Sequence, residues 1–262
     1  MKKRIFLTAA VAVLSSALLA ACSSGGKNAN QPVTYTYVFS SDPATLDYTV
    51  SGNSSTKQVT GNVIDGLLEN DQYGNLVPSV AEDWSVSKDG LTYTYKIRKG
   101  IKWYTNEGEE YGEVKAQDFV TGLKHAVAKK SQALYLVQDS IKGLDDYING
   151  KTNDFSTVGI KATDDYTLVY TLNNPESFWN SKTTMGVLAP INEDFLASKG
   201  DDFGKPTDVT SILYNGPYLL KGLTSKSSIE MTKNQNYWDK GNVFIDDIKL
   251  TFFDGQDADS LG

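Results

Sequence analysis

The sequence predicts a mixed α/β or α+β fold. Two periodicities alternate along the chain: apolar residues at every second position, as in half-buried strands, and apolar residues every three or four positions, as on a helix face. The two kinds of segment interleave, and no internal repeat occurs. With 262 residues, 40% of them apolar and 22% charged, the chain can bury a core and does not have the composition of a disordered protein.

The first predicted elements are a strand and a helix. Apolar or aromatic side chains occupy alternate positions from 33 to 39, which predicts a half-buried or edge strand. A loop runs through Gly52. Beyond it, Val59, Val63 and Leu67 recur every four residues and predict one apolar face of a helix.

A hairpin is the next predicted element. Asp89-Gly90 separates two alternating runs, 84–87 and 91–97, and Gly at this place adopts positive φ without steric cost. The two tyrosines of the second run share a face with its aliphatic residues, so we expect them in the core. A second amphipathic helix is predicted to begin near Lys115. The remaining predicted turns are 71–75 and 164–165, and the remaining predicted strands are 168–172, 217–220, 229–232 and 245–253.

Composition excludes several classes of function. The net charge of −7 argues against a nucleic-acid binder, which needs a basic face. One Cys permits no intramolecular disulfide and no cysteine-based zinc site, and one His removes most histidine-dependent catalysis. The 15 Tyr, 10 Phe and 4 Trp residues are more typical of a binding protein than of a catalyst.

No motif indicates catalysis or a bound metal. His125 has no nucleophile motif to serve, so we expect a structural or surface role for it. Adjacent acidic residues do not by themselves face each other across a cleft, as a glycosidase requires. Asp254, Asp257 and Asp259 depart from the calcium-loop pattern and are interpreted as part of a frayed tail, 254–262. We expect no cofactor and no metal.

The amino terminus is typical of a bacterial lipoprotein signal. Three cations at positions 2–4 precede an apolar run from Ile5 to Ala21, which ends in small residues before Cys22. We therefore predict cleavage after residue 21 and lipidation of Cys22. The alternatives are an ordinary secretory peptide and an uncleaved anchor helix with an incidental Cys.

The segment after Cys22 is small and polar, and predicts a flexible tether over 22–32. Removal of residues 1–21 takes away three cations and leaves a net charge of −10. We expect the mature protein on the extracellular face of the cytoplasmic membrane, attached to the lipid bilayer through acylated Cys22, in a Gram-positive cell envelope.

Several separated motifs resemble extracellular solute-binding protein family 5. The segments 81–84 and 89–103 have the spacing of the family signature. The other resembling segments follow in the family's order: Asp42-Pro43-Ala44-Thr45-Leu46-Asp47, Asp65-Gly66-Leu67-Leu68, Ala116-Gln117-Asp118-Phe119-Val120, Asn215-Gly216-Pro217-Tyr218 and Asn234-Gln235-Asn236-Tyr237-Trp238-Asp239. The match runs from about Val33 to Phe253 and is most similar to oligopeptide-binding lipoproteins of peptide ABC importers.

The resemblance implies a periplasmic-binding-protein-like class II lobe with an inserted smaller α+β domain. Family members are roughly twice as long, so we expect the second lobe to be missing, in a truncated reading frame or a fragment. The implied domains are 33–63, the opening part of the first lobe; 64–189, the inserted domain; and 190–253, the second part of the first lobe.

The resemblance also implies the function. It predicts a non-enzymatic, monomeric substrate-binding component of an ABC transporter, which captures extracellular oligopeptides for membrane permease subunits. The alternatives are a binder of carbohydrate or metal chelate with the same architecture, and a surface adhesin or hydrolase. The implied peptide-binding residues are Ser51, Gly52, Asn53, Tyr135, Asn215 and Gly216.

Two expectations follow from the missing lobe. We expect the strand 245–253 to have an unpaired or poorly covered edge. We also expect this 262-residue chain by itself to bind peptides weakly or not at all, because the second lobe would supply about half of the contacts.

Overall fold

The computed structural model describes residues 31–255, and the residues from Thr34 onward belong to one compact unit. The predicted signal peptide, Cys22, most of the tether and residues 256–262 lie outside the described part. Between residues 31 and 255, no helix has the length and apolar character needed to cross a membrane.

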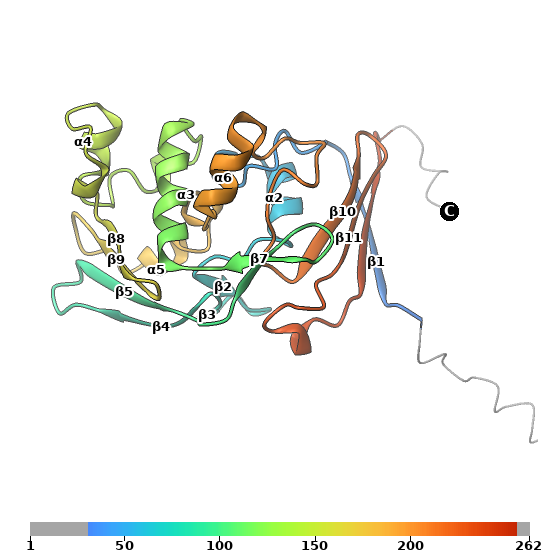
Figure 1. Cartoon of the computed structure of the whole chain (residues 1–262), viewed down its shortest axis with the longest axis horizontal. Coiled ribbons are helices and arrows are strands. Elements are labelled where there is room, and N and C mark those ends of the chain that lie inside the picture. The colour runs from blue at the N-terminus through green and yellow to red at the C-terminus, as the bar shows by residue number, and fades with distance from the viewer. Residues whose placement is uncertain (1–30, 256–262) are drawn as a thin grey trace, which may run out of the picture. The chain divides into compact units, whose positions relative to one another are not determined.

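Strands from the beginning and the end of the described chain form one four-stranded sheet, in the order β1-β12-β11-β10 (Figure 1). β1 runs parallel to β12, and the other neighbours are antiparallel. The expectation of an unpaired edge at 245–253 is therefore wrong, because β12 lies between β1 and β11. The two edge strands are β1 and β10, and in β1 the Tyr35 and Tyr37 side chains are about half exposed. The bounds are β1 Thr34–Phe39, β10 Tyr218–Thr224, β11 Ser228–Lys233 and β12 Asp247–Phe252.

A second four-stranded sheet, fully antiparallel, has the order β4-β5-β9-β8. The predicted hairpin is confirmed: Gly90 has φ of 70° in the turn between β4 and β5. Tyr93 and Tyr95 are buried, as expected. Because β5 pairs with β9, and β9 begins 75 residues after β5 (167 − 92), the sheet joins two segments that are distant in the sequence. The bounds are β4 Ala81–Val86, β5 Thr92–Ile97, β8 Ile160–Asp164 and β9 Thr167–Thr171.

The helix predicted near Lys115 is confirmed as α3, Ala116–Ala128, which packs against β8 and β9. Its start is stabilised by Asp118, whose carboxylate accepts hydrogen bonds from the Lys115 backbone N–H at 3.1 Å and from Trp103 Nε1 at 2.7 Å. Phe119 and Leu123 are fully buried on the inner face. The Asp118 carboxylate therefore caps the start of helix α3, as the acidic residue of a capping box does, and the apolar stripe holds the helix in place.

The helix predicted over Val59, Val63 and Leu67 is shorter than expected. α2, Ser54–Thr60, ends before Gly61, although Val63 and Leu67 are buried. The backbone after the helix pairs with the chain that leads into β10 instead, since Val63 O accepts from Gly216 N at 3.0 Å. Val59, Val63 and Leu67 recur every four residues because all three are buried, and not because all three lie in one helix. The helix ends early because the backbone beyond it pairs with the distant Gly216.

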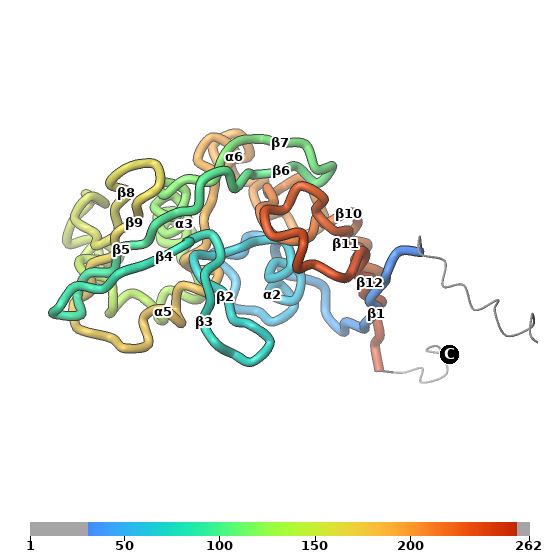
Figure 2. Tube along the Cα trace, turned by 90° about the horizontal axis from the view of Figure 1, so that it is seen from below, coloured from blue at the N-terminus to red at the C-terminus, as the bar shows by residue number. Residues whose placement is uncertain are grey.

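Two short hairpins were not predicted as strands, and they lie on opposite sides of the trace in Figure 2. Their strands are only three or four residues long, which is too short for a clear alternation. The bounds are β2 Leu68–Asn70, β3 Leu76–Pro78, β6 Lys102–Tyr104 and β7 Glu110–Glu113. The remaining elements are α4 Leu144–Ile148, α5 Trp179–Lys182, α6 Glu193–Lys199, and the 3₁₀ turns η1 Leu134–Leu136, η2 Phe155–Thr157, η3 Gly186–Leu188, η4 Gly200–Asp202 and η5 Lys240–Asn242.

Gly122 lets α3 approach the segment around Ala189 closely, and this contact gives a first testable prediction. A Cβ at Gly122 would lie 2.1 Å from the Ala189 carbonyl oxygen. Gly→Ala inside a helix ordinarily stabilises by about 1 kcal/mol, but Gly122→Ala should lower the free energy of unfolding by about 1–3 kcal/mol, because the backbones must separate. Urea unfolding measures the effect.

The matched control is Gly112→Ala in β7, where an added Cβ meets no heavy atom within 4 Å. We expect its effect on stability to be under about 1 kcal/mol. A Gly122→Ala protein as stable as the parent chain would contradict the close approach of α3 to Ala189.

Candidate functional site

Three of the predicted peptide-binding residues lie in the loop before α2. Gly52 and Asn53 are exposed, while Ser51 is buried and its Oγ accepts a hydrogen bond from Asn53 N at 3.1 Å. Asn53 is the N-cap residue of α2, and its side chain makes no capping hydrogen bond. A Cβ at Gly52 would come no nearer than 3.8 Å to the Gln132 side chain, so the outer side of the loop is open.

The loop is attached to the segment that carries Tyr135. Ser131 Oγ donates to Thr49 O at 2.6 Å, and Gln132 N donates to Val50 O at 3.0 Å. The Gly52 N–H also points to Gln132 Oε1 at 3.4 Å. Tyr135 follows in η1 with 73% of its surface exposed. The structure therefore brings Ser51, Gly52 and Asn53 together with the neighbourhood of Tyr135.

A buried acid–base pair fixes the start of this loop. Asp47 Oδ2 lies 2.7 Å from His125 Nε2, and both side chains are only 6% exposed. The other oxygen, Asp47 Oδ1, accepts from the Thr49 N–H at 3.1 Å and from the Thr49 hydroxyl at 2.7 Å. The ring of His125 also packs edge-to-face on Phe203. His125, the one His of the sequence, therefore has a structural role: it connects helix α3 to the loop that Asp47 begins.

Asn215 and Gly216 lie in a different environment. Asn215 is buried, and its side-chain amide forms two hydrogen bonds with the backbone of Asp65, N–H to Oδ1 at 2.9 Å and Nδ2 to O at 3.2 Å. A Cβ at Gly216 would lie 2.6 Å from the Val63 carbonyl carbon. Both residues hold the 63–65 segment, and no hydrogen bond among the described residues joins them to the Ser51–Asn53 loop.

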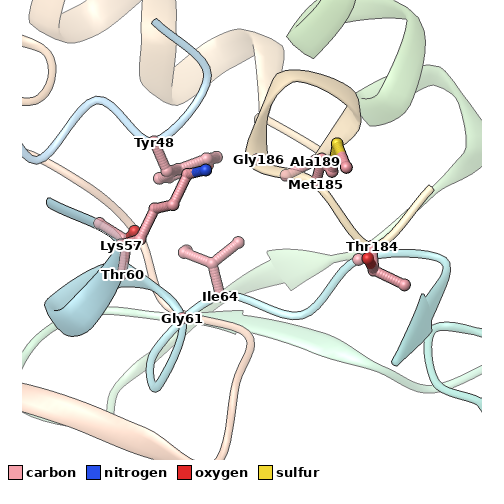
Figure 3. Close-up of a pocket in the computed structure, with 10 residues that line it drawn as sticks. Tyr48, Lys57, Thr60, Gly61, Ile64, Thr184, Met185, Gly186 and Ala189 are labelled. Atoms are coloured by element: carbon pink, nitrogen blue, oxygen red, sulfur yellow. The ribbon is translucent and has the colours of Figure 1, made fainter. Parts of the chain in front are cut away.

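A pocket of about 210 Å³ opens beside α2 (Figure 3). Its walls come from residues far apart in the sequence: the turn at Tyr48, the end of α2, Ile64, and the segment from Thr184 to Ala189. Most of the lining is apolar, and Lys57 is the one charged side chain among the ten lining residues. We call this the Lys57 pocket. Because the lining residues are far apart in the sequence, no local pattern predicted the pocket.

Asp65 is the most strongly perturbed carboxyl group near these elements. Tyr237 donates its hydroxyl to Asp65 Oδ2 at 2.7 Å, and Trp238 Nε1 lies at 3.5 Å from the same oxygen. Burial raises the pKa of Asp65 to about 7, although these hydrogen bonds oppose the shift. The Arg98 guanidinium lies 4.1 Å from the Trp238 ring centroid, a cation–π contact. The cluster joins segments far apart in the sequence.

The described residues of this region supply hydrogen-bonding groups, apolar surface and one cation. Within the described residues no three His, Cys, Asp or Glu side chains gather as a metal site. The loop offers exposed backbone and amide groups, and the Lys57 pocket offers apolar surface with one cation. The sequence did not point to Lys57, Met185 or the role of Asp47. Polarity gave no signal for Lys57, because helix α2 is polar at every position except Val59.

A protein-family model, described as bacterial extracellular solute-binding proteins, family 5 Middle, matches residues 75–261. Oligopeptide-binding protein AliA of Streptococcus pneumoniae is 64% identical over 255 residues, which cover 97% of this chain and 39% of AliA. Oligopeptide-binding protein SarA of Streptococcus gordonii is 62% identical over 98% of this chain and 40% of SarA. The chain thus spans about 40% of the length of these curated relatives.

Solved structures show the same architecture. Listeria monocytogenes OppA bound to peptide superposes with a TM-score of 0.78 at 30% identity, over 85% of this chain and 43% of that chain. Haemophilus influenzae OppA in complex with RPPGFSPFR gives a TM-score of 0.78 at 26% identity, over 86% of this chain and 43% of that chain. These likenesses confirm the mixed α/β fold that was expected.

Proposed function

Because the chain belongs to the bacterial extracellular solute-binding proteins of family 5, we propose that it serves the capture of oligopeptides for an ABC importer. The observation that carries the proposal is the open Ser51–Asn53 loop beside the Lys57 pocket, in a chain more than 60% identical to two oligopeptide-binding proteins. The proposed activity is reversible binding without chemical conversion.

The loop suits a peptide backbone better than it suits most other ligands. Gly52 has no side chain to hold a ligand backbone away, and the amide of Asn53 can both donate and accept hydrogen bonds. Tyr135 adds an exposed aromatic surface nearby. Peptide contacts at Asn215 and Gly216 remain a prediction; the contacts of these two residues support an indirect role, in which they hold the 63–65 segment.

The proposal also includes the cellular location of the protein and its binding partners. An apolar run that ends at Cys22 supports a cleaved signal and a lipid anchor, and the family description places its members outside the cell. The proposed partners are the permease subunits of the importer and the lipid bilayer, and the protein acts as a monomer. The proposed domain boundaries at 63/64 and 189/190 are supported by the sheets, since β1 and β10 to β12 come only from the outer segments.

The proposal is tested by ligand binding at two chain lengths. One sample is the 262-residue chain, and the other is this chain joined to the remaining residues of AliA, called the extended chain. Calorimetry with a mixed peptide panel should detect binding by the extended chain, and weak or no binding by the 262-residue chain. Peptide binding in the micromolar range or tighter by the shorter chain would show that its own contacts suffice.

The same samples separate the ligand classes in a thermal-shift screen, because a ligand stabilises the folded state to which it binds. We expect peptides to raise the melting temperature of the extended chain. Stabilisation by sugars or metal chelates, without stabilisation by peptides, would overturn the peptide proposal. Turnover of a peptide panel would instead favour a hydrolase.

A further inference from the structure

The Lys57 pocket has rigid walls. The Tyr48 hydroxyl donates to Pro190 O at 2.8 Å, which holds the ring in place. The backbone of η3, in the same segment as Pro190, also lies directly against Tyr48, because a Cβ at Gly186 would be 2.3 Å from Tyr48 O. Ile64 and Met185 supply apolar surface between these walls (Figure 3). The cavity is therefore formed by packed backbone and a fixed ring.

Lys57 brings a positive charge to this cavity. It lies in α2 one turn after Asn53, whose carbonyl accepts the Lys57 N–H at 3.1 Å, so the lysine directly follows the open loop. Figure 3 shows its side chain extended along the pocket beside Tyr48. Eight other lysines of residues 31–255 lie within 4.0 Å of a carboxylate oxygen, whereas no ion pair of this kind is formed by Lys57.

The cation and the apolar walls determine which chemical groups of a ligand the Lys57 pocket would bind. A carboxylate would pair with the Lys57 ammonium, and a short aliphatic stem would lie against Ile64 and Met185. A basic group would be repelled. Tyr48 does not add a negative charge, because burial raises the pKa of its phenol well above the ordinary value. The cavity thus combines one cation with apolar walls.

We propose that the Lys57 pocket is a carboxylate subsite for the bound peptide. The carboxylate comes either from an acidic side chain or from the peptide's C-terminus. This inference rests on the proposed function, and it specifies which part of a peptide would lie beside the loop.

The first experiment examines the pocket without any need for peptide capture. Methyl resonances of Ile64 and Met185 are recorded by NMR in the 262-residue chain during titration with N-acetylglutamate amide or N-acetylglutamine amide at millimolar concentration. We expect shifts with the acidic probe, absent in Lys57→Met and kept in Lys124→Met, a change of an exposed lysine outside the pocket. Equal shifts with both probes, or shifts that survive Lys57→Met, overturn the subsite.

The second experiment identifies the source of the carboxylate. Calorimetry on the extended chain compares peptides that differ only in Glu against Gln at one position, or in a free against an amidated C-terminus. The preferred acidic member of one of these pairs should lose about fivefold in affinity in Lys57→Met, with its neutral partner unchanged. Equal weakening of both members overturns the proposal. If no peptide binds the extended chain at all, the proposed function fails, and the NMR titration still decides whether the pocket binds carboxylates.

Discussion

Replacement of Asp47 by alanine should lower the free energy of unfolding by several kcal/mol, about 1–3 kcal/mol for each buried donor that it leaves without an acceptor. His125 would lose the carboxylate oxygen that lies 2.7 Å from its Nε2, and the N–H and hydroxyl of Thr49 would lose their acceptor. Urea unfolding monitored by tryptophan fluorescence measures the loss. Since Asp47 also fixes the loop that leads to Ser51, peptide affinity of the extended chain should fall as well.

Two variants distinguish the loss of the buried Asp47–His125 contact from a general effect of removing a carboxylate charge. Asp47→Asn keeps an oxygen that can accept from Thr49 and should cost less than Asp47→Ala. Asp201→Ala removes a carboxylate that pairs with Lys129 at 2.9 Å but is 99% exposed, so its effect should be under about 1 kcal/mol. A change below about 1 kcal/mol for Asp47→Ala would show that the buried pair does not hold the fold.

Stability should decrease as the pH rises from about 4 to about 7, through the buried carboxyl of Asp65, whose pKa is raised to about 7 from an ordinary value of 3.8. In this interval the folded chain keeps a proton that the unfolded chain has released, so the free energy of unfolding falls with increasing pH. The stabilisation by Asp65 is fully present at pH values below the pKa of this residue in the unfolded chain. It is lost as the pH rises through the pKa of Asp65 in the folded chain, which is about 7. The pKa shift of Asp65 can contribute at most about 4 kcal/mol to the free energy of unfolding.

Asp65→Asn isolates this contribution, because asparagine can accept the Tyr237 hydroxyl without titrating. Urea unfolding at several pH values should show the variant gaining stability relative to the parent chain as the pH increases. A smaller slope of the same sign should remain, since burial also raises the pKa of Asp118 to about 6. Parallel pH profiles for the variant and the parent chain would contradict a raised pKa at Asp65.

Local patterns predicted the elements that depend on neighbouring residues. The hairpin around Gly90 and the helix α3 were found from turn chemistry and apolar spacing, which act over a few residues. The pairing of β12 with β1 was missed because it joins the two ends of the described chain. For the same reason α2 was predicted too long: the backbone bond from Gly216 to Val63 has no local signal.

The candidate site was predictable only in part. The family resemblance pointed to the loop at Ser51 and to Tyr135, and the structure shows that their segments are hydrogen-bonded to each other. The Lys57 pocket was not predicted, since Tyr48, Lys57 and Met185 meet only after the chain has folded. His125 was expected to be structural or surface-exposed, but its partner Asp47 could not be named from the sequence.

The parallel pairing of β1 with β12 also sets an order of events during synthesis. Thr34 stands opposite Asp247, so more than 200 residues must be made between the two partners. At translation rates of about 5–20 residues per second, β1 waits roughly 10–40 s before its partner exists. The antiparallel sheet from Ala81 to Thr171 can form during this time. The first strand of the chain is therefore among the last to be placed.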